Sequence, residues 1–260
     1  EGMYGLVLEG GGGRGAYQMG ACKAIKEMGL EISMVAGTSV GALNGAMIVQ
    51  GEIDKAYDIW YDLEPSSVIM FAGNELEQYK GNSFKPEALK AFTKNLRTVI
   101  AEGGLNVEPL EKMVKGLLDE DKIRKSPIGF AVVTVDLTER KAVEIYKEDI
   151  PRGQLADYVI ASASFPAFKR TIIDGRSFID GALYNVLPIN LVSKKGYKQI
   201  IVLRTYSLGI KRHVNQKDLN IISISPAERL SSTMDFSKKS ARKNLKMGYE
   251  DAVNVLERLL

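Results

Sequence analysis

The first 50 residues contain two glycine-rich turns, and each turn lies between a short apolar run and a helical pattern. Short apolar runs at residues 4–8 and 32–36 lead into these glycine-rich turns, which is typical of buried strands. After the first turn, apolar residues recur at helical spacing over residues 15–28. The second turn leads into residues 40–49, which carry no charge and therefore predict a helix buried on most sides. Two such units in succession indicate an α/β fold.

The same alternation continues through the rest of the chain. Further strands are expected at residues 128–137, 142–146, 171–173, 177–179, 199–205 and 220–225. Further helices are expected at residues 53–63, from near Pro86, after Pro109, at 155–163 and at 234–260. Residues 51–125 then form a mostly helical variable region. We expect residues 1–260 to be a single domain, a three-layer α/β/α sandwich with a mostly parallel central sheet.

The composition argues against several kinds of site. The chain has 35 basic and 32 acidic residues, and its net charge of +3 does not indicate a nucleic-acid binder. A single cysteine, Cys22, and a single histidine, His213, leave no disulfide framework and argue against a zinc site. No apolar window reaches the roughly 18 residues that span a bilayer, and no signal-like segment precedes the first strand. We therefore expect a cytoplasmic location.

The first turn, residues 10–15, places several backbone N–H groups at a helix start, where the helix dipole favours negative charge. Its glycines are Gly10, Gly11, Gly12, Gly13 and Gly15. The favoured interpretation is a cradle for an oxyanion. The Gly-x-Gly-x-x-Gly spacing also fits a dinucleotide-binding turn, which needs an acidic residue at the end of the second strand. That strand leads instead into Ser39, and Glu31 lies at its beginning. A plain tight turn is the third alternative.

The second turn reads Gly-Thr-Ser-Val-Gly over residues 37–41. Gly37 and Gly41 flank Ser39 as in a sharp strand-to-helix elbow, where a Cβ would collide because strand and helix pack closely. The serine hydroxyl would then project from the turn at the positive end of the following helix. The alternative is an ordinary turn in which Ser39 only caps the helix. Its position between a predicted strand and a buried helix favours a nucleophile.

Two Asp-Gly pairs lie close together and offer a base for this serine. The pair that begins at Asp174 lies between two apolar runs, which is typical of a hairpin turn, so its role is interpreted as structural. Asp180 follows the second run and precedes the small residues Gly181 and Ala182, so its side chain can emerge beside a site. An ordinary aspartate pKa of about 3.9 is too low for a base near neutral pH. Burial would have to raise it.

A conventional triad is the alternative to this two-residue mechanism. Ser39, Asp180 and His213 follow the chain order of an α/β-hydrolase triad. The neighbours of His213 are basic and polar, without apolar periodicity, and the nucleophile comes earlier in the chain than such a triad usually places it. These features favour a solvated loop histidine, which leaves Asp180 as the base.

Taken together, the motifs resemble those of the patatin-like phospholipases. The glycine cradle, the elbow and the Asp-Gly-Ala triplet at 180–182 stand in that family's order and spacing, and residues 161–168 resemble its segment before the aspartate. The resemblance implies hydrolysis of lipid esters by a Ser-Asp dyad, a sheet wrapped by helices, and no metal or organic cofactor. By position, Ser39 is the nucleophile and Asp180 the proton acceptor. The implied oxyanion hole consists of the N–H groups of Gly11, Gly12 and Gly13, with Arg14 close by.

Two further segments bear on partners. Residues 67–72 form an apolar patch, for which packing against the core is favoured over a lid or lipid-facing wall. Residues 237–246 contain five basic residues and no acid. A solvated helix face is the favoured interpretation, and contact with an anionic membrane surface is the alternative. The rival functions are a nucleotide-dependent oxidoreductase and a non-catalytic lipid-binding module.

Overall fold

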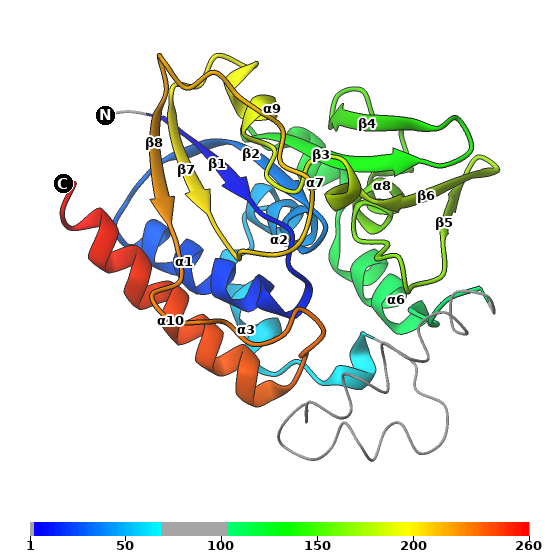
Figure 1. The fold of residues 1–260 in the computed structure, drawn as a ribbon, viewed down its shortest axis with the longest axis horizontal. Coiled ribbons are helices and arrows are strands. Elements are labelled where there is room, and N and C mark those ends of the chain that lie inside the picture. Colours follow the sequence, from blue (N-terminus) through cyan, green and yellow to red (C-terminus); the bar gives the residue numbers. More distant parts are fainter. Residues whose placement is uncertain (1–2, 69–102, 260) are drawn as a thin grey trace.

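A single sheet organises the fold of this protein, for which a computed structural model describes residues 3–68 and 103–259. The strands are β1 Tyr4–Leu8, β2 Ile32–Thr38, β3 Gly129–Asp136, β4 Lys141–Tyr146, β5 Thr171–Ile173, β6 Arg176–Asp180, β7 Gln199–Leu203 and β8 Asn220–Ile224. Within the described residues they form one sheet in the order β5-β6-β3-β2-β1-β7-β8, with β4 paired to β3 (Figure 1). The pairs among β3, β2, β1, β7 and β8 are parallel, whereas β4, β6 and β5 join antiparallel.

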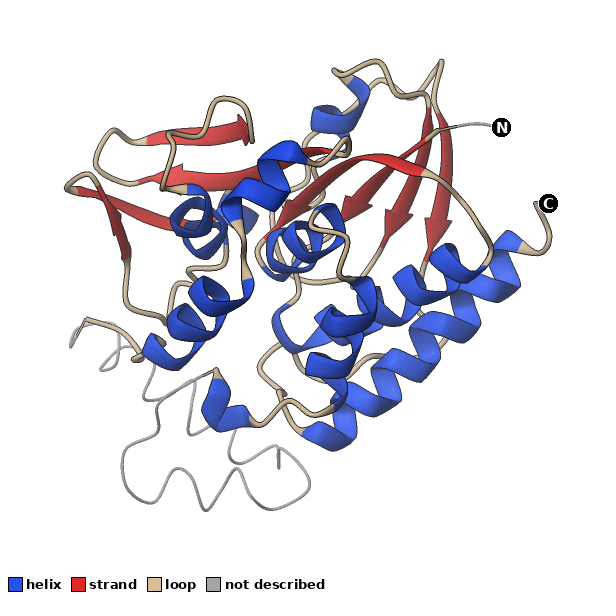
Figure 2. Ribbon diagram, turned by 180° about the vertical axis from the view of Figure 1, so that it is seen from behind, coloured by secondary structure: helices blue, strands red, loops and turns tan. Residues whose placement is uncertain are grey.

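Helices cover both faces of this sheet, and most of them lie on one face (Figure 2). The α-helices of the described chain are α1 Gly15–Glu27, α2 Val40–Val49, α3 Ile53–Tyr61, α6 Glu108–Leu117, α7 Glu120–Lys125, α8 Leu155–Ser162, α9 Ile189–Ser193 and α10 Lys238–Leu256. Short 3-10 helices occur at Gly12–Arg14, Pro65–Ser67 and Gly181–Leu183. The expected α/β/α sandwich with a mostly parallel sheet is confirmed.

The core follows the two-residue period of the strands. Leu6 and Leu8 of β1 are buried in the cluster that includes α1, α2 and α10. Val7, between them, is buried in the opposite cluster, together with Leu191 and Val192 of α9. Because successive strand side chains point to opposite faces, an apolar run such as β1 predicts a strand covered on both sides.

Strand register explains how residues far apart in sequence come together. Thr38, the last residue of β2, pairs with Val133 of β3. The next residue of β3, Thr134, pairs with Asp180 at the end of β6. Ser39, which directly follows β2, and Asp180, which ends β6, therefore lie at the same end of the sheet, with only β3 between their two strands.

Most predicted elements lie within a few residues of their observed positions. The clearest difference is the last helix, which was expected from residue 234 and begins at Lys238. Ser237 ends the preceding loop as an N-cap, because its side chain accepts a hydrogen bond from the Ser240 N–H. Helix α9 was not predicted, since five residues are too few for a helical period. The helix expected near Pro86 lies outside the described residues.

The described helices are those of a protein without a bilayer-spanning segment in this part of the chain. In residues 3–68 and 103–259, no helix is sufficiently long and apolar to span a bilayer. No group of three or more histidine, cysteine, aspartate or glutamate side chains is arranged to hold a metal in the same part of the chain. Cys22 is buried within α1.

Candidate active site

Ser39 lies at the sharp turn between β2 and α2. Its backbone has φ 59° and ψ −125°, which an L-residue other than glycine rarely adopts. A Cβ at Gly37 would lie 2.1 Å from the Gly41 carbonyl oxygen, and one at Gly41 would lie 2.3 Å from the Leu8 carbonyl oxygen. The elbow therefore needs both glycines for close packing, and it holds the serine in a strained conformation of the kind found at nucleophile turns.

A buried serine supports this turn from α8. The Ser162 Oγ accepts a hydrogen bond from the Ser39 N–H at 2.9 Å and donates one to the Val133 carbonyl oxygen at 2.5 Å. Ser162 is fully buried, so these partners satisfy its hydroxyl. The Ser39 backbone is thereby attached to the central strand β3. Sequence reasoning noted residues 161–168 but assigned no role to this side chain.

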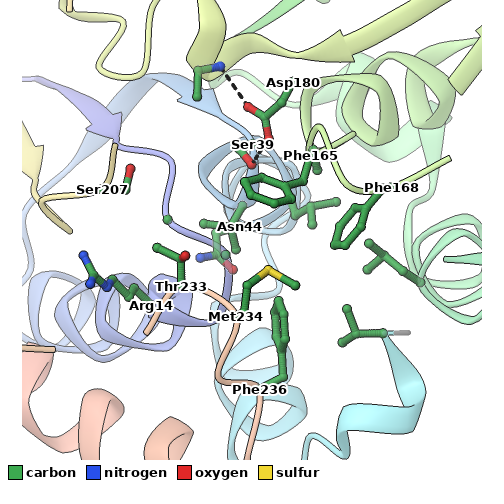
Figure 3. A pocket seen from close by; sticks show the side chains of 18 of the residues that line it. Arg14, Ser39, Asn44, Phe165, Phe168, Asp180, Ser207, Thr233, Met234 and Phe236 are labelled. Atoms are coloured by element: carbon green, nitrogen blue, oxygen red, sulfur yellow. Dashed lines mark hydrogen bonds between the residues drawn. The ribbon is translucent and has the colours of Figure 1, made fainter. Parts of the chain in front are cut away.

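Asp180 ends β6 with its carboxylate next to Ser39. The Ser39 Oγ donates a hydrogen bond to Asp180 Oδ2 at 2.6 Å, and the Ala182 N–H donates to Asp180 Oδ1 at 2.8 Å (Figure 3). Asp180 is 3% exposed. Burial raises the pKa of this carboxyl to about 6, although both hydrogen bonds act to lower it. The serine is therefore paired with a carboxylate more basic than an ordinary aspartate.

Two residues of the glycine turn, Gly11 and Gly12, line a cavity. The Gly10 N–H donates to the Val186 carbonyl and the Gly13 N–H to the Thr233 carbonyl, at 3.1 and 2.7 Å. Within the described residues, the N–H groups of Gly11 and Gly12 donate to no other group, and both residues line the cavity. Gly12 has φ 54°, and a Cβ there would lie 2.2 Å from the Thr233 carbonyl oxygen. The free donors are thus Gly11 and Gly12, whereas the Gly13 amide is already engaged.

Arg14 connects the glycine turn to two other loops. Its guanidinium donates to the carbonyl oxygens of Ser231, Thr205 and Tyr206, at 2.7, 3.0 and 3.1 Å respectively. Desolvation by burial and the nearby charge of Arg229 lower the pKa of Arg14. With three carbonyl partners, this side chain mainly fixes the loops around the cavity.

Glu9 is a second connecting residue, and it was not among the predicted site residues. Its buried carboxylate accepts hydrogen bonds from the N–H groups of Thr205 and Tyr206, and it pairs with Arg204 at 2.9 Å. The end of β7 is thereby attached to the residue that precedes the glycine turn. A charged residue directly after an apolar strand was a possible signal.

The other residues considered in the sequence analysis have packing roles or lie in exposed turns and loops. A Cβ at Gly15 would lie 2.3 Å from the Val40 side chain, and one at Gly181 would lie 2.0 Å from the Val133 carbonyl oxygen. Asp174 lies in the turn between β5 and β6, as predicted, and accepts a hydrogen bond from Gln154. His213 is exposed in the loop after β7 and makes no hydrogen bond to either dyad residue within the described chain.

Ser39 and Asp180 open onto a cavity of about 580 Å³. Arg14 and Ser207 lie to one side of Ser39, and two phenylalanines lie on the other (Figure 3). The apolar part of the lining comes from separate parts of the chain, for example Leu63, Leu110, Phe165, Phe168, Met234 and Phe236. The polar groups are concentrated at Ser39 and the glycine turn, so the cavity suits a long apolar group with one polar linkage.

The dinucleotide alternative has little support from this geometry. A ribose would need an acidic residue at the end of β2. That end carries Thr38, whose hydroxyl donates to the Asn185 carbonyl, and Ser39, whose partner is Asp180. Glu31 directly precedes β2, at the other end of that strand from Ser39.

Comparison with known sequences identifies the family. Residues 6–192 match the family described as patatin-like phospholipase. The chain is 24% identical to patatin-like phospholipase domain-containing protein 7 of Rattus norvegicus, over 76% of this chain and 13% of that protein. It is 26% identical to lysophospholipase NTE1 of Kluyveromyces lactis, over 98% of this chain and 16% of that protein. The chain therefore spans less than a fifth of the length of these relatives.

Two solved structures have a similar fold. VipD from Legionella pneumophila superposes with a TM-score of 0.57 at 16% identity, over 99% of this chain and 67% of that one. A human GIVD cytosolic phospholipase A2, solved with methyl gamma-linolenyl fluorophosphonate, gives 0.53 at 11% identity, over 99% of this chain and 58% of that one. The mostly parallel sheet and its flanking helices thus form a patatin-type α/β fold. The chain belongs to the patatin-like phospholipase family.

Proposed function

We propose that this chain is a serine acyl hydrolase of lipid esters, of the phospholipase A or lysophospholipase type, with Ser39 as nucleophile and Asp180 as base. The observation that carries the proposal is the 2.6 Å hydrogen bond from Ser39 Oγ to Asp180 Oδ2 at the wall of an apolar cavity. No histidine is needed, because the base contacts the nucleophile directly.

In the first half of the reaction, Ser39 Oγ attacks the ester carbonyl while Asp180 Oδ2 accepts the hydroxyl proton. The carbonyl oxygen becomes an oxyanion, which the free N–H groups of Gly11 and Gly12 stabilise at the start of α1. One such donor contributes about 3 kcal/mol to transition-state stabilisation in a well-studied protease. The C–O bond to the leaving alcohol then breaks, and protonated Asp180 gives its proton to that alcohol. The product is an acyl-enzyme on Ser39.

In the second half, water takes the place of the alcohol. Asp180 accepts one proton of the water as its oxygen attacks the acyl carbonyl, and the same two amides stabilise the second oxyanion. The bond to Ser39 Oγ breaks, the serine recovers the proton from Asp180, and a carboxylic acid leaves. A pKa of about 6 favours both steps, because the carboxylate is ionised at neutral pH and still basic enough to accept a proton.

The apolar wall of the cavity supports a fatty acyl substrate. Phe165 and Phe168 line the cavity together with Leu63 and Phe236 of the same buried cluster. Burying a methylene group in such a lining contributes about 0.8 kcal/mol. A long acyl chain therefore gains far more binding free energy than a short one. Relatives named as a phospholipase-domain protein and a lysophospholipase point to the same substrate class.

The test is covalent labelling with a long-chain fluorophosphonate, followed by mass spectrometry of the modified peptide. We expect one adduct, on Ser39, and none in Ser39→Ala. Ser223→Ala is the matched control, since Ser223 is an exposed serine on β8 and its loss should leave labelling unchanged. Labelling of another residue, or a Ser39 that does not react while a long-chain ester is hydrolysed, would overturn the assignment. Tight NAD binding without hydrolysis would support the oxidoreductase alternative.

A further inference from the structure

We propose that the mouth of the cavity docks on an anionic lipid bilayer, with residues 206–212, here called the rim loop, as the inserting element. The proposal rests on the proposed lipid hydrolase function, since it supplies the route by which a bilayer lipid reaches Ser39. It concerns a different surface and a different measurement from the dyad, so either proposal can fail without the other.

The rim loop exposes apolar side chains where the cavity opens. Leu208 is 96% exposed, and Tyr206 and Ile210 are exposed by 56% and 49%. Leu208 and Tyr206 also line the cavity, as does Leu183, which is 47% exposed. A side chain that both lines a cavity and faces solvent marks its edge. A cluster of exposed apolar residues is unusual on a protein surface and indicates a binding surface.

Hydrogen bonds hold the two ends of this loop in place. The Arg14 guanidinium binds the Tyr206 carbonyl oxygen at 3.1 Å. The Ile210 N–H donates to the Ala182 carbonyl oxygen at 2.9 Å, and the Val186 N–H donates to the Ile210 carbonyl oxygen at 2.7 Å. Leu208 therefore projects between two fixed points. The anchors are the glycine turn and the segment after Asp180, so the loop is fixed relative to the site.

The charges around the rim loop are complementary to an anionic surface. Residues 205–217 contain Lys211, Arg212 and Lys217 but no acid. Arg229, which lines the cavity, is exposed as well. Within the described residues, Lys211, Arg212 and Arg229 take part in no ion pair; Arg212 instead donates to the Tyr184 carbonyl and stacks 3.8 Å from the Tyr184 ring. Their positive charge is therefore available to lipid phosphates.

The basic run of α10 is a competing surface, and the structure balances its charge. Four of its five basic residues have acidic partners: Lys238 with Glu64, Arg242 with Asp62, Lys243 with Glu228, and Lys246 with Glu250. These acidic partners offset the positive charge that would otherwise attract an anionic membrane. The interpretation of that run as a solvated helix face fits these ion pairs. The rim loop is therefore the better candidate for the membrane-binding surface.

Two kinds of interaction determine the expected effects. Each lysine or arginine close to an anionic surface strengthens binding about fivefold, and salt weakens this contribution. Partial transfer of one leucine side chain from water to the acyl region contributes about tenfold. Reversing the charge of Lys211 should therefore weaken vesicle binding about tenfold or more, and replacing Leu208 by serine should do so about tenfold.

The experiment is co-sedimentation of the full chain with phosphatidylcholine vesicles that contain or lack about 30% phosphatidylglycerol, an anionic lipid that gives the vesicle surface a negative potential. We expect preference for the anionic vesicles, loss of that preference in high salt, and weakened binding in Leu208→Ser, Ile210→Ser and Lys211→Glu. Leu259→Ser removes an exposed leucine near the C-terminus and Lys239→Glu reverses an exposed charge on α10. Both controls should bind like the parent chain.

Hydrolysis of a short-chain ester dissolved as monomers separates docking from catalysis. Ile210 and Lys211 do not line the cavity, so Ile210→Ser and Lys211→Glu should retain this activity and lose activity on vesicles. The proposal would be overturned if the rim-loop variants bound vesicles like the parent chain while Lys239→Glu bound more weakly. Equal binding to neutral and anionic vesicles, or no binding to either, would also overturn it. Failure of fluorophosphonate labelling on Ser39 would instead refute the proposed function.

Discussion

The two Asp-Gly pairs that bracket β6 have the same composition and opposite roles. Asp174 precedes the strand in a two-residue turn, where Asp174 and Gly175 have φ values of 49° and 73°, and its side chain is exposed. Asp180 ends the strand, and its carboxylate is buried against Ser39. Four strand residues, 176–179, separate a solvated turn from a carboxyl whose pKa is about 6.

The difference arises from what surrounds each end of β6. The first pair needs only its own backbone, because an Asp-Gly turn with positive φ at both positions closes a hairpin without long-range contacts. At the second pair, a Cβ on Gly181 would lie 2.0 Å from the Val133 carbonyl oxygen. Close packing against β3 removes water from Asp180 and sets it beside the elbow. An Asp-Gly dipeptide predicts only a local turn, whereas the role of each aspartate depends on how the surrounding sheet packs against it.

The largest expected effect is on turnover. Asp180→Asn and Ser39→Ala should each lower kcat/KM for a long-chain ester by about 1,000-fold or more, because the base or the nucleophile is lost. Asp174→Asn is the matched control, since asparagine tolerates positive φ and the turn is far from Ser39. It should stay within about twofold of the parent rate. Steady-state hydrolysis with equal amounts of folded protein measures all three variants. Similar rates for Asp180→Asn and Asp174→Asn would contradict the assignment of different roles to the two Asp-Gly pairs.

The second prediction uses the raised pKa of Asp180. A buried carboxyl with a folded pKa of about 6, against an ordinary 3.8, binds its proton more tightly in the folded state. Its ionisation therefore lowers the free energy of unfolding as pH rises from about 4 to 6, by about 3 kcal/mol at most. Asp180→Asn carries no such charge, so its stability advantage over the parent should appear across that window and remain at pH 8.

Urea unfolding of both chains at pH 4.5 and pH 8 measures this difference, with Asp174→Asn again as the control. The parent's kcat/KM should also fall about tenfold per pH unit below 6, because the base must be ionised. A flat stability difference between the two pH values would mean that burial does not raise the pKa of Asp180. The dyad would then need another source of basicity.

The amino-acid sequence predicted the sheet, the hairpin at Asp174 and the elbow, because each has a local signal in periodicity or glycine placement. The pairing of Ser39 with Asp180 was a hypothesis based on chain order and family resemblance. The contacts of Ser162 and Gly13 were not predicted, since each joins backbone segments more than 100 residues apart and leaves no periodic trace. The Met234 side of the cavity was missed for a related reason, because that loop was assigned to the last helix.

The third prediction concerns the support of the elbow. Ser162→Ala leaves the buried Ser39 N–H without its partner, which costs about 1–3 kcal/mol. We expect kcat to fall about tenfold with little change in KM, because the nucleophile is displaced while the cavity remains. Ser164→Ala is the control, since its hydroxyl donates to the Lys169 carbonyl outside the dyad. Ser162→Thr should recover part of the rate, and equal losses in the two alanine variants would assign Ser162 a purely structural role.

The smallest effect is expected at the turn that precedes β6. A Cβ at Gly175 meets no atom within 4 Å, so alanine is opposed only by the backbone, whose φ is 73°. Gly175→Ala should lower the free energy of unfolding by about 1 kcal/mol, and Gly175→Asn by less, because asparagine accepts this conformation more readily. Urea unfolding measures both, and kcat/KM per folded molecule should stay unchanged. If Gly175→Ala lowered the rate as well, the hairpin would be coupled to Asp180 through β6, and the two ends of the strand could not be treated as separate.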